Sequence, residues 1–287
     1  MLKKNLKAYL CLIAAMACMA IAHAGEANPK KLRVALLPDE NASTVLKNNR
    51  PLETYLENKL GMPIELVVTT DYSSMIEAMR HGRLELAYFG PLSYVLARSK
   101  SEIEPFVALK TKGSTTYHSV LVGNVAAGVN SPADARGRNV AYGDKASTSS
   151  HLIPKSMLAE AGLVAGTGYK EHFVGSHDAV AMAVQAGHAQ MGGLSKPIFE
   201  SLVERKMIDP NKVKVIAESK PYPQYPWAMR SDLDPSLKKR IKEAFINISD
   251  PAVLKPFKAD GFGPIADSDY NVVRELASLL KLDLAKF

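Results

Sequence analysis

The strongest constraint on the fold is the alternation of short apolar runs with longer amphipathic stretches along the 287-residue chain. Residues 32–37 form an apolar run that ends in a polar turn, and a helical stretch follows to about residue 60. Residues 64–68 and 84–89 predict two further strands, and residues 73–80 predict the helix between them. Such an opening predicts a parallel sheet with helices packed against its faces.

The same pattern recurs in a second unit that begins at residue 139. The expected elements are strands at 139–142, near 173 and at 189–193, and helices that reach 161 and span 179–186. Residues 71–90 also align with residues 176–195, each as a polar turn, a short helix, a glycine and a strand. The alignment pairs Tyr72 with His177. We therefore expect two α/β lobes, each presenting the N-terminus of a helix.

Two apolar runs, at residues 119–124 and 213–217, bracket the second unit. We interpret them as the ends of two crossover segments, so that the second lobe is an insertion in the first. The expected division is lobe one at residues 25–120 and 224–287, and lobe two at residues 121–223. Helices near 235–248 and 270–280 would complete lobe one. A cleft between two discontinuous lobes suits capture of a ligand by closure.

Residues 1–24 have the features of a cleavable export signal. Three lysines form a basic start, residues 9–21 form an apolar core, and residues 22–24 (Ala-His-Ala) resemble a cleavage site. The apolar core is shorter than the roughly 20 residues of a membrane span. Cys18 allows a lipoprotein as an alternative, but residues 15–17 are a poor match to the sequence before a lipidation site. We therefore expect a soluble, exported protein.

The composition constrains how the mature chain is held together and what it binds. Both cysteines, Cys11 and Cys18, lie in the expected signal, so about 260 residues must fold around a hydrophobic core without disulfides. The formal net charge of +7 falls by three to +4 when the signal lysines are removed. The remaining basic residues are scattered among acidic ones rather than clustered with aromatics. We therefore expect a mixed, solvated surface and no nucleic-acid partner.

The stretch AYGDKASTSSHLIP, residues 141–154, places four hydroxyl side chains and a histidine directly after an expected strand. Ser and Thr are unfavourable inside a helix but favourable at its start, where hydroxyls and free N–H groups can bind an anion. Pro154 is compatible with a first turn, so we expect the helix to begin within the run. An N-cap alone explains one or two of these residues, and the further hydroxyls favour an anion site.

Three other residues are candidates for the walls of this site. His177 and Tyr72 occupy matched positions at the starts of short helices, and Tyr117 precedes the first expected crossover. Isolated His and Tyr residues are usually structural, and the matched positions are what favours a functional role here. Tyr88 and Tyr94 fit either a cleft wall or the core.

The competing class of function is a hydrolase of phosphate or phosphonate esters. Ser147, His177 and Asp178 could supply a nucleophile and a base, but no G-x-S-x-G motif surrounds any serine, and GLSKP at 193–197 lacks the second glycine. We interpret Asp39, Glu40 and Asn41 as a turn and a helix cap, with a role in ligand binding as the alternative. No histidine pair has metal-ligand spacing, and there is no phosphate-binding glycine loop. We therefore expect no catalytic residue, no metal and no cofactor.

Several motifs together resemble the phosphonate-type periplasmic substrate-binding proteins of ABC importers. They are DYSSMIEAM, LAYFGPLSY, TTYHSVLVGN, GDKASTSSHLIP and VGSHDAV, and the similarity extends over nearly the whole mature chain. LLPDENAS and PYPQYPWAMR are similar to the phosphite-binding members. The resemblance implies a two-lobed α/β fold of the venus-flytrap type, with mixed sheets flanked by helices and two crossovers. It also implies a location in the periplasm and a membrane permease as partner, and we expect a monomer.

The resemblance further implies which side chains contact the ligand. In this family the S-T-S hydroxyls and the helix N–H groups bind the phosphorus oxygens, and these positions are Ser147, Thr148 and Ser149 here. The tyrosine of the D-Y turn, the tyrosine of the Y-x-S-V strand and the histidine of the second turn also contact the ligand. In this sequence they are Tyr72, Tyr117 and His177.

One departure from the family pattern concerns the group bonded to phosphorus. Members that bind aminoalkyl phosphonates place an acid in the second crossover, where this chain has Tyr225, with Trp227 two residues later. An aromatic wall would fit P–H or P–CH3 and would leave the fourth oxygen of phosphate unpartnered, at a cost of roughly 1–3 kcal/mol. The two aromatics could equally pack at the hinge. We expect phosphite as the ligand, with methylphosphonate, another small phosphonate or hypophosphite as alternatives.

Overall fold

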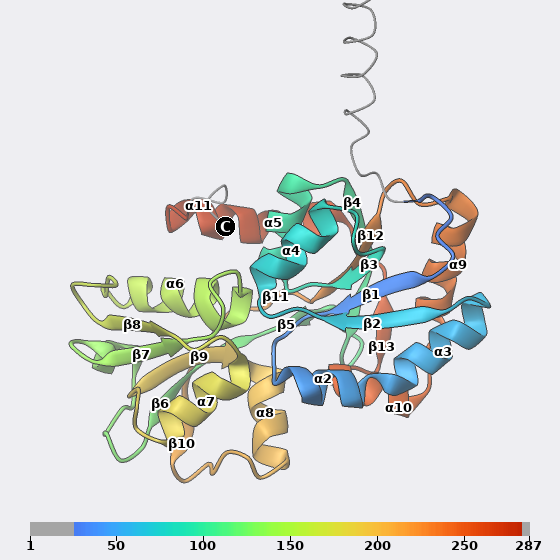
Figure 1. Cartoon of the computed structure of the whole chain (residues 1–287). Coiled ribbons are helices and arrows are strands. Elements are labelled where there is room, and N and C mark those ends of the chain that lie inside the picture. Colours follow the sequence, from blue (N-terminus) through green and yellow to red (C-terminus); the bar gives the residue numbers. More distant parts are fainter. Residues whose placement is uncertain (1–25, 283–287) are drawn as a thin grey trace, which may run out of the picture.

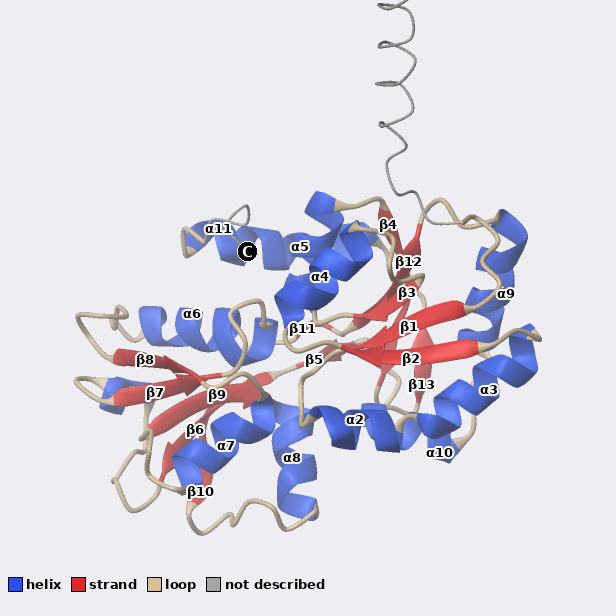
Figure 2. Cartoon of the chain, viewed as in Figure 1, coloured by secondary structure: helices blue, strands red, loops and turns tan. Residues whose placement is uncertain are grey.

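Two β-sheets organise the chain, and each forms the centre of one lobe (Figure 1). The computed structural model describes residues 26–282. The export signal expected at residues 1–24 lies outside the described residues. Helices pack against both sheets (Figure 2), so the expected two-lobed α/β fold is confirmed.

The sheet of lobe one has six strands in the order β13-β4-β12-β3-β1-β2. The strands are β1 (Leu32–Leu36), β2 (Ile64–Val68), β3 (Leu86–Tyr88), β4 (Ile103–Lys110), β12 (Pro226–Arg230) and β13 (Gly261–Gly263). β1 pairs in parallel with β2 and β3, whereas β12 and β13 run antiparallel to their neighbours. β1 is almost wholly apolar because helices cover both faces of the sheet.

The helices of lobe one form two pairs around this sheet. α3 (Arg50–Leu60) packs against α9 (Pro235–Ile246), and α4 (Tyr72–Arg80) packs against α5 (Pro91–Lys100). The remaining helices of this lobe are α2 (Ala42–Asn48), α10 (Pro251–Leu254), α11 (Asn271–Leu279) and the short 3-10 turns η3 (Lys255–Phe257) and η4 (Asp267–Tyr270). One continuous hydrophobic core lies between these helices and the sheet.

The sheet of lobe two has five strands in the order β10-β6-β9-β7-β8. The strands are β6 (Ser119–Asn124), β7 (Asn139–Tyr142), β8 (Lys170–Phe173), β9 (Met191–Ser195) and β10 (Val213–Glu218), and the helical segments are η1 (Pro132–Ala135), η2 (Thr148–Leu152), α6 (Ile153–Glu160), α7 (His177–Gln185) and α8 (Lys196–Glu204). β7 is parallel to β8 and β9, and β6 is antiparallel to β9 and β10. Separate apolar clusters lie on its two faces, one beneath α7 and α8 and the other beneath α6.

The chain crosses between the lobes through a two-stranded ribbon. β5 (Thr116–Tyr117) pairs antiparallel with β11 (Tyr222–Pro223). The apolar runs that were expected to end the crossovers lie just inside this ribbon, as β6 and β10, and pair with each other. The exact lobe boundaries at 120/121 and 223/224 stay a prediction.

One expected helix is divided in two. The stretch from the first strand to residue 60 contains α2 and α3, which are separated at Asn49. The N–H of Asn49 closes α2, and Pro51 lies in the first turn of α3, where proline is tolerated because its missing N–H would have no acceptor inside the helix. Within residues 26–282, no helix combines the length and the apolar character that crossing a bilayer requires.

Candidate ligand-binding site

The hydroxyl run forms the start of a helix in lobe two, directly after β7. The Ser147 hydroxyl caps this start by accepting a hydrogen bond from the N–H of Ser150 at 3.1 Å. Residues 148–152 form one wide π-type turn, and α6 follows with Pro154 in its first turn. The N–H groups at such a start have no acceptor inside the helix, so those of Thr148 and Ser149 can serve a ligand.

The four hydroxyls of the run differ in their hydrogen-bond partners. Ser150 is used internally, since its hydroxyl donates to the carbonyl of Gly193 at 2.5 Å and accepts from the N–H of Gly143 at 2.9 Å. The hydroxyls of Ser147 and Thr148 each accept a main-chain N–H, which leaves their own protons to donate. The Ser149 hydroxyl lies 3.3 Å from the phenol oxygen of Tyr225. Three of the four hydroxyls can therefore face a bound oxyanion.

Two buried tyrosines stand against this run from outside lobe two. Tyr72 begins α4 after the cap residue Asp71, and the Ser147 side chain is among the groups close to its phenol. Tyr117 lies on β5, with its ring 5.1 Å from that of Tyr225, and the hydroxyls of Thr148 and Ser149 are close to its phenol. Burial raises the pKa of both phenols, so both remain neutral and can donate a hydrogen bond.

His177 begins α7 and is held in one tautomer. Its Nδ1 accepts a hydrogen bond from the main-chain N–H of Ser195 at 3.0 Å, so the proton of the neutral ring resides on Nε2. Burial lowers the pKa of His177 to about 3, which keeps the ring neutral. Nε2–H is therefore a fixed donor, directed away from Ser195.

The clearest sign of a ligand site is a set of buried polar atoms that lack partners. Within residues 26–282 these atoms are Asn49 Oδ1, Tyr72 Oη, Tyr117 Oη, His151 Nε2, His177 Nε2 and Trp227 Nε1. Folded proteins avoid such groups, because each one costs roughly 1–3 kcal/mol. Three of the six are on Tyr72, Tyr117 and His177, which the sequence analysis selected as candidate ligand contacts.

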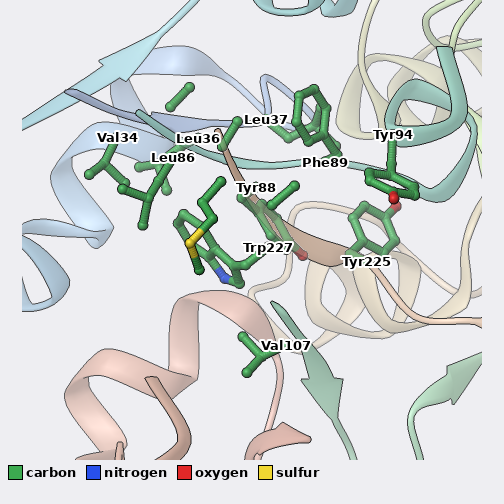
Figure 3. Close-up of a cluster of buried hydrophobic side chains, with 14 of the residues drawn as sticks. Val34, Leu36, Leu37, Leu86, Tyr88, Phe89, Tyr94, Val107, Tyr225 and Trp227 are labelled. Carbon is green, nitrogen blue, oxygen red and sulfur yellow. The ribbon is translucent and has the colours of Figure 1, made fainter. Parts of the chain in front are cut away.

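An aromatic cluster lies beside the run, and it separates Tyr225 from Trp227. Tyr225 stacks on Tyr88, with ring centroids 5.5 Å apart, and Tyr88 packs against Trp227 at 5.3 Å. Trp227 also packs on Phe245 and is fully buried in the core of lobe one (Figure 3). Tyr225 therefore reaches the hydroxyl run directly, whereas Trp227 supports the cluster from behind.

Tyr94, whose place the sequence left open, belongs to the core. Its phenol donates to Asp267 at 2.6 Å and its ring packs on Tyr270, 4.9 Å away. Tyr88, by contrast, lines a pocket next to the site together with Asp39, Ser195 and Tyr225.

Asp39, which the sequence analysis interpreted as part of a turn and cap, lies next to the site. Its main-chain oxygen accepts a hydrogen bond from the N–H of His177 at 2.9 Å, and Asp39 lines the same pocket as Tyr88 and Tyr225. Burial raises its pKa to about 7, although the charge of Lys258 opposes the rise. Only Asn41 of the expected turn and cap acts as a cap, by accepting from the N–H of Thr44 at 3.2 Å. The available signal was the position of Asp39 in the turn that follows the first strand.

The two lobes are in contact around the site through the starts of their helices. In lobe one, the N–H groups of Asn41, Tyr72 and Leu92 lie at the starts of α2, α4 and α5. Each donates to a side-chain oxygen of lobe two. Asn41 donates to Asp178 Oδ2 at 3.2 Å, Tyr72 to Asp144 Oδ2 at 3.2 Å, and Leu92 to Thr148 Oγ1 at 2.7 Å. The structure therefore represents a closed arrangement.

A further ion-pair network joins the lobes at the mouth of the pocket. Glu40 of lobe one contacts Arg205 at the end of α8 and Lys258 of lobe one, the latter at 2.6 Å. Within the described part of the chain, no group of three or more His, Cys, Asp or Glu side chains is arranged to hold a metal ion.

Comparisons with known proteins show which family the chain resembles. The family model described as "ABC transporter, phosphonate, periplasmic substrate-binding protein" matches residues 34–270. The chain is 28% identical to the phosphate-import protein PhnD of Mycolicibacterium smegmatis, over 88% of this chain and 87% of that protein. It is 26% identical to the probable ABC transporter phosphite binding protein PhnD1 of Prochlorococcus marinus, over 88% of this chain and 91% of that protein.

Solved structures share the fold. PhnD1 of Prochlorococcus marinus in complex with methylphosphonate gives a TM-score of 0.80 at 24% identity, over 88% of this chain and 99% of that chain. A binding-protein component of an ABC phosphonate transporter from Pseudomonas aeruginosa gives a TM-score of 0.81 at 20% identity, over 88% of this chain and 87% of that chain. These TM-scores show that the two-lobed α/β fold is common to the three proteins.

Proposed function

Because the chain belongs to the phosphonate-type periplasmic substrate-binding proteins of ABC transporters, we propose that it captures phosphite between its lobes and delivers it to a membrane permease. As a member of this family, the protein is the substrate-binding component of an importer for phosphonates or phosphite, and it is not an enzyme. The choice of phosphite, the contact residues and the monomeric state are our proposals.

The observation that carries the proposal is the set of neutral donors without protein partners. We propose that the hydroxyls and N–H groups of the run at 147–149 hold the oxygens from lobe two. Tyr72 Oη, Tyr117 Oη and His177 Nε2–H would donate to the same oxygens from around the run, and each now lacks a partner. A hydrogen bond to a charged group contributes roughly 1.5–3 kcal/mol, so several convergent donors suffice for tight binding.

The substituent on phosphorus would face the aromatic side of the site. Tyr225 lies where aminoalkyl-binding members of the family carry an acid, and it stacks on Tyr88, which Trp227 supports from the core. A ring surface offers an ammonium group only a cation–π contact, whereas it accommodates P–H or P–CH3. This environment favours phosphite, and methylphosphonate or hypophosphite is the second choice. The relatives named for phosphate and phosphite import indicate that the ligand differs within the family.

Capture would proceed by closure of the lobes. A ligand held by the run in lobe two would recruit Tyr72 of lobe one, and closure would form the contacts between the helix starts. The closed state, stabilised by the ligand, is then the form that the permease would recognise.

The test is calorimetric titration of the ligand-stripped mature protein with phosphite, methylphosphonate, hypophosphite, 2-aminoethylphosphonate, phosphate and sulfate. Tight binding of phosphite with little response to phosphate is the expected result. Preference for phosphate or for an aminoalkyl phosphonate would refute the argument from the aromatic side of the site. Turnover of a chromogenic phosphate ester would contradict a pure binding role.

The site assignment needs a separate arm with matched variants. Ser147→Ala and His177→Ala should each weaken binding of the preferred anion while the protein remains folded. Ser150→Ala is the control, because the Ser150 hydroxyl is already used by Gly143 and Gly193. Unchanged affinity in both site variants would disprove the assignment.

A further inference from the structure

The turn after β1 is where lobe one contacts two helices of lobe two. The main-chain groups of Asp39 and Asn41 form hydrogen bonds of 2.9 and 3.2 Å to the first two residues of α7. Between them, the Glu40 carboxylate contacts the guanidinium group of Arg205, the residue that follows α8. Three consecutive residues of lobe one therefore hold lobe two, and Glu40 does so through a charged side chain.

The Glu40 carboxylate is fixed by a second cation that belongs to its own lobe. The Lys258 ammonium group lies 2.6 Å from Glu40 Oε1, whereas Arg205 contacts Oε2. Burial alone would raise the pKa of the Glu40 carboxyl group, but the two cations outweigh it and lower the pKa, so the group is charged at neutral pH. The contact with Lys258 can persist when the lobes separate, and the contact with Arg205 cannot.

The helix α8 connects this ion pair to the proposed ligand site. Ser195 directly precedes the helix, and its N–H donates to Nδ1 of His177 at 3.0 Å. Arg205 lies at the other end, and the nine residues between them span about 14 Å. When lobe two turns toward lobe one, the His177 ring and the Arg205 side chain move with it. The pair between Glu40 and Arg205 can therefore form only in the closed arrangement.

We propose that Glu40 and Arg205 are positioning residues that form a latch between the lobes and slow the release of a captured anion without touching it. In the open form, Lys258 keeps Glu40 charged and ordered, so closure has to order only the Arg205 side chain. The pair forms after the ligand has entered and must break before the ligand leaves. It therefore stabilises every captured anion to the same extent. The inference rests on the proposed function, since it requires capture of an anion by closure.

Glu40→Gln distinguishes the latch from a simple effect of charge. The variant keeps the size of the side chain and removes a negative charge near an anion site, and by Coulomb's law alone this would tighten binding. The latch predicts the opposite, a roughly tenfold rise in the dissociation constant, because a hydrogen-bonded contact between charged groups is lost. The rise should come from faster dissociation at an unchanged association rate, and it should be equal for every phosphorus oxyanion that binds.

Variants of Arg205 test the other half of the pair. Arg205→Gln should weaken binding as Glu40→Gln does, and the double variant should lose little more than either single one, because both remove the same contact. Arg205→Lys should retain part of the affinity. Lys155→Gln is the matched control, since it also removes a positive charge from lobe two. The partner of Lys155 is Glu171 of the same lobe, 2.7 Å away, so the control should leave affinity and dissociation rate unchanged.

The measurements are calorimetric titration for the dissociation constants and rapid-mixing displacement of bound anion for the dissociation rates. Both use the ligand-stripped mature protein with phosphite, methylphosphonate and phosphate. Unchanged or tighter binding in Glu40→Gln, slower association as the sole change, or additive losses in the double variant would each overturn the latch.

The outcomes separate this inference from the choice of ligand. If phosphate or methylphosphonate binds better than phosphite and Glu40→Gln still speeds its dissociation, the latch stands and phosphite is the wrong ligand. If phosphite binds as expected and Glu40→Gln releases it at the wild-type rate, the proposed ligand stands and the latch is refuted. Binding of none of the anions would overturn the proposed function and this inference with it.

Discussion

Replacement of Tyr117 by phenylalanine should change stability and affinity in opposite directions. The phenol oxygen of Tyr117 is buried without a hydrogen-bond partner among the described residues, and the ring packs against that of Tyr225. In the ligand-free protein, Tyr117→Phe removes a group whose burial costs roughly 1–3 kcal/mol when it is unsatisfied. We therefore expect the free energy of unfolding to rise, by about 1 kcal/mol.

The same variant should bind the ligand more weakly. It loses one hydrogen bond to a charged oxygen, worth roughly 1.5–3 kcal/mol, which corresponds to a loss of affinity of about 10- to 150-fold. Urea denaturation of the ligand-free protein measures the first effect, and calorimetric titration with the preferred anion measures the second. Thermal denaturation with saturating ligand should reverse the order of stability between variant and wild type.

Tyr94→Phe is the control for this experiment. The Tyr94 phenol donates to Asp267 at 2.6 Å and makes no hydrogen bond to the hydroxyl run among the described residues. Its loss should therefore lower stability and leave affinity unchanged. If Tyr117→Phe behaves like Tyr94→Phe, with lower stability and unaltered affinity, the phenol is structural and the reasoning from unpartnered donors is refuted.

Three further predictions follow from the same contacts. Ser147→Ala removes both an N-cap and a ligand donor, so unfolding free energy should fall by about 1 kcal/mol and affinity by tenfold or more; intact affinity by calorimetry would restrict Ser147 to capping. Burial lowers the pKa of His151 to about 4 and of His177 to about 3, so the unfolded chain binds more protons below pH ~6.5. Each histidine should lower ligand-free stability by about 1.4 kcal/mol per pH unit as pH drops below that value, whereas Asp39, whose pKa is raised to about 7, acts in the opposite direction and should offset one of them. Denaturant titrations that show no net loss of stability in acid would contradict this. Trp227→Phe should destabilise the core by about 1–3 kcal/mol and keep the order of ligand preference, because Tyr88 lies between Trp227 and Tyr225; a changed order in titrations would place Trp227 in direct contact with the ligand.

The architecture was predictable from the sequence where strands are apolar and punctuated by turns. β1, β6 and β7 lie within a residue or two of their expected positions, because strands buried on both faces read as apolar runs. β2 also lies at its expected position, although it is a partly exposed edge strand. α5 was missed, since seven of its ten residues are buried and the apolar run from β3 into it has no amphipathic period. β12 was missed because Pro221, Pro223 and Pro226 lie before and at its start, and prolines at this density are typical of a turn.

The candidate site was predictable only where local chemistry marks it. A hydroxyl run before a helix and two residues at matched helix starts stand out by position alone, and their role in binding stays a prediction. Asp39 could not be separated from an ordinary turn acid, since its place depends on how lobe two folds against lobe one. The positions of Tyr225 and Trp227 relative to Tyr88 likewise depend on pairing between β3 and β12, whose residues are far apart in the sequence.

In the contacts between helix starts, mutation can change the contribution of lobe two more easily than that of lobe one. Lobe one contributes main-chain N–H groups, which no substitution except one to proline can delete. Lobe two contributes the side chains of Asp144, Thr148 and Asp178, which mutation can alter one at a time. The balance between open and closed forms is therefore expected to evolve through lobe two. Thr148 differs from the two aspartates, because its hydroxyl oxygen takes part in both the contact between the lobes and the proposed contact with the ligand. A mutation of Thr148 would therefore change closure and ligand affinity together.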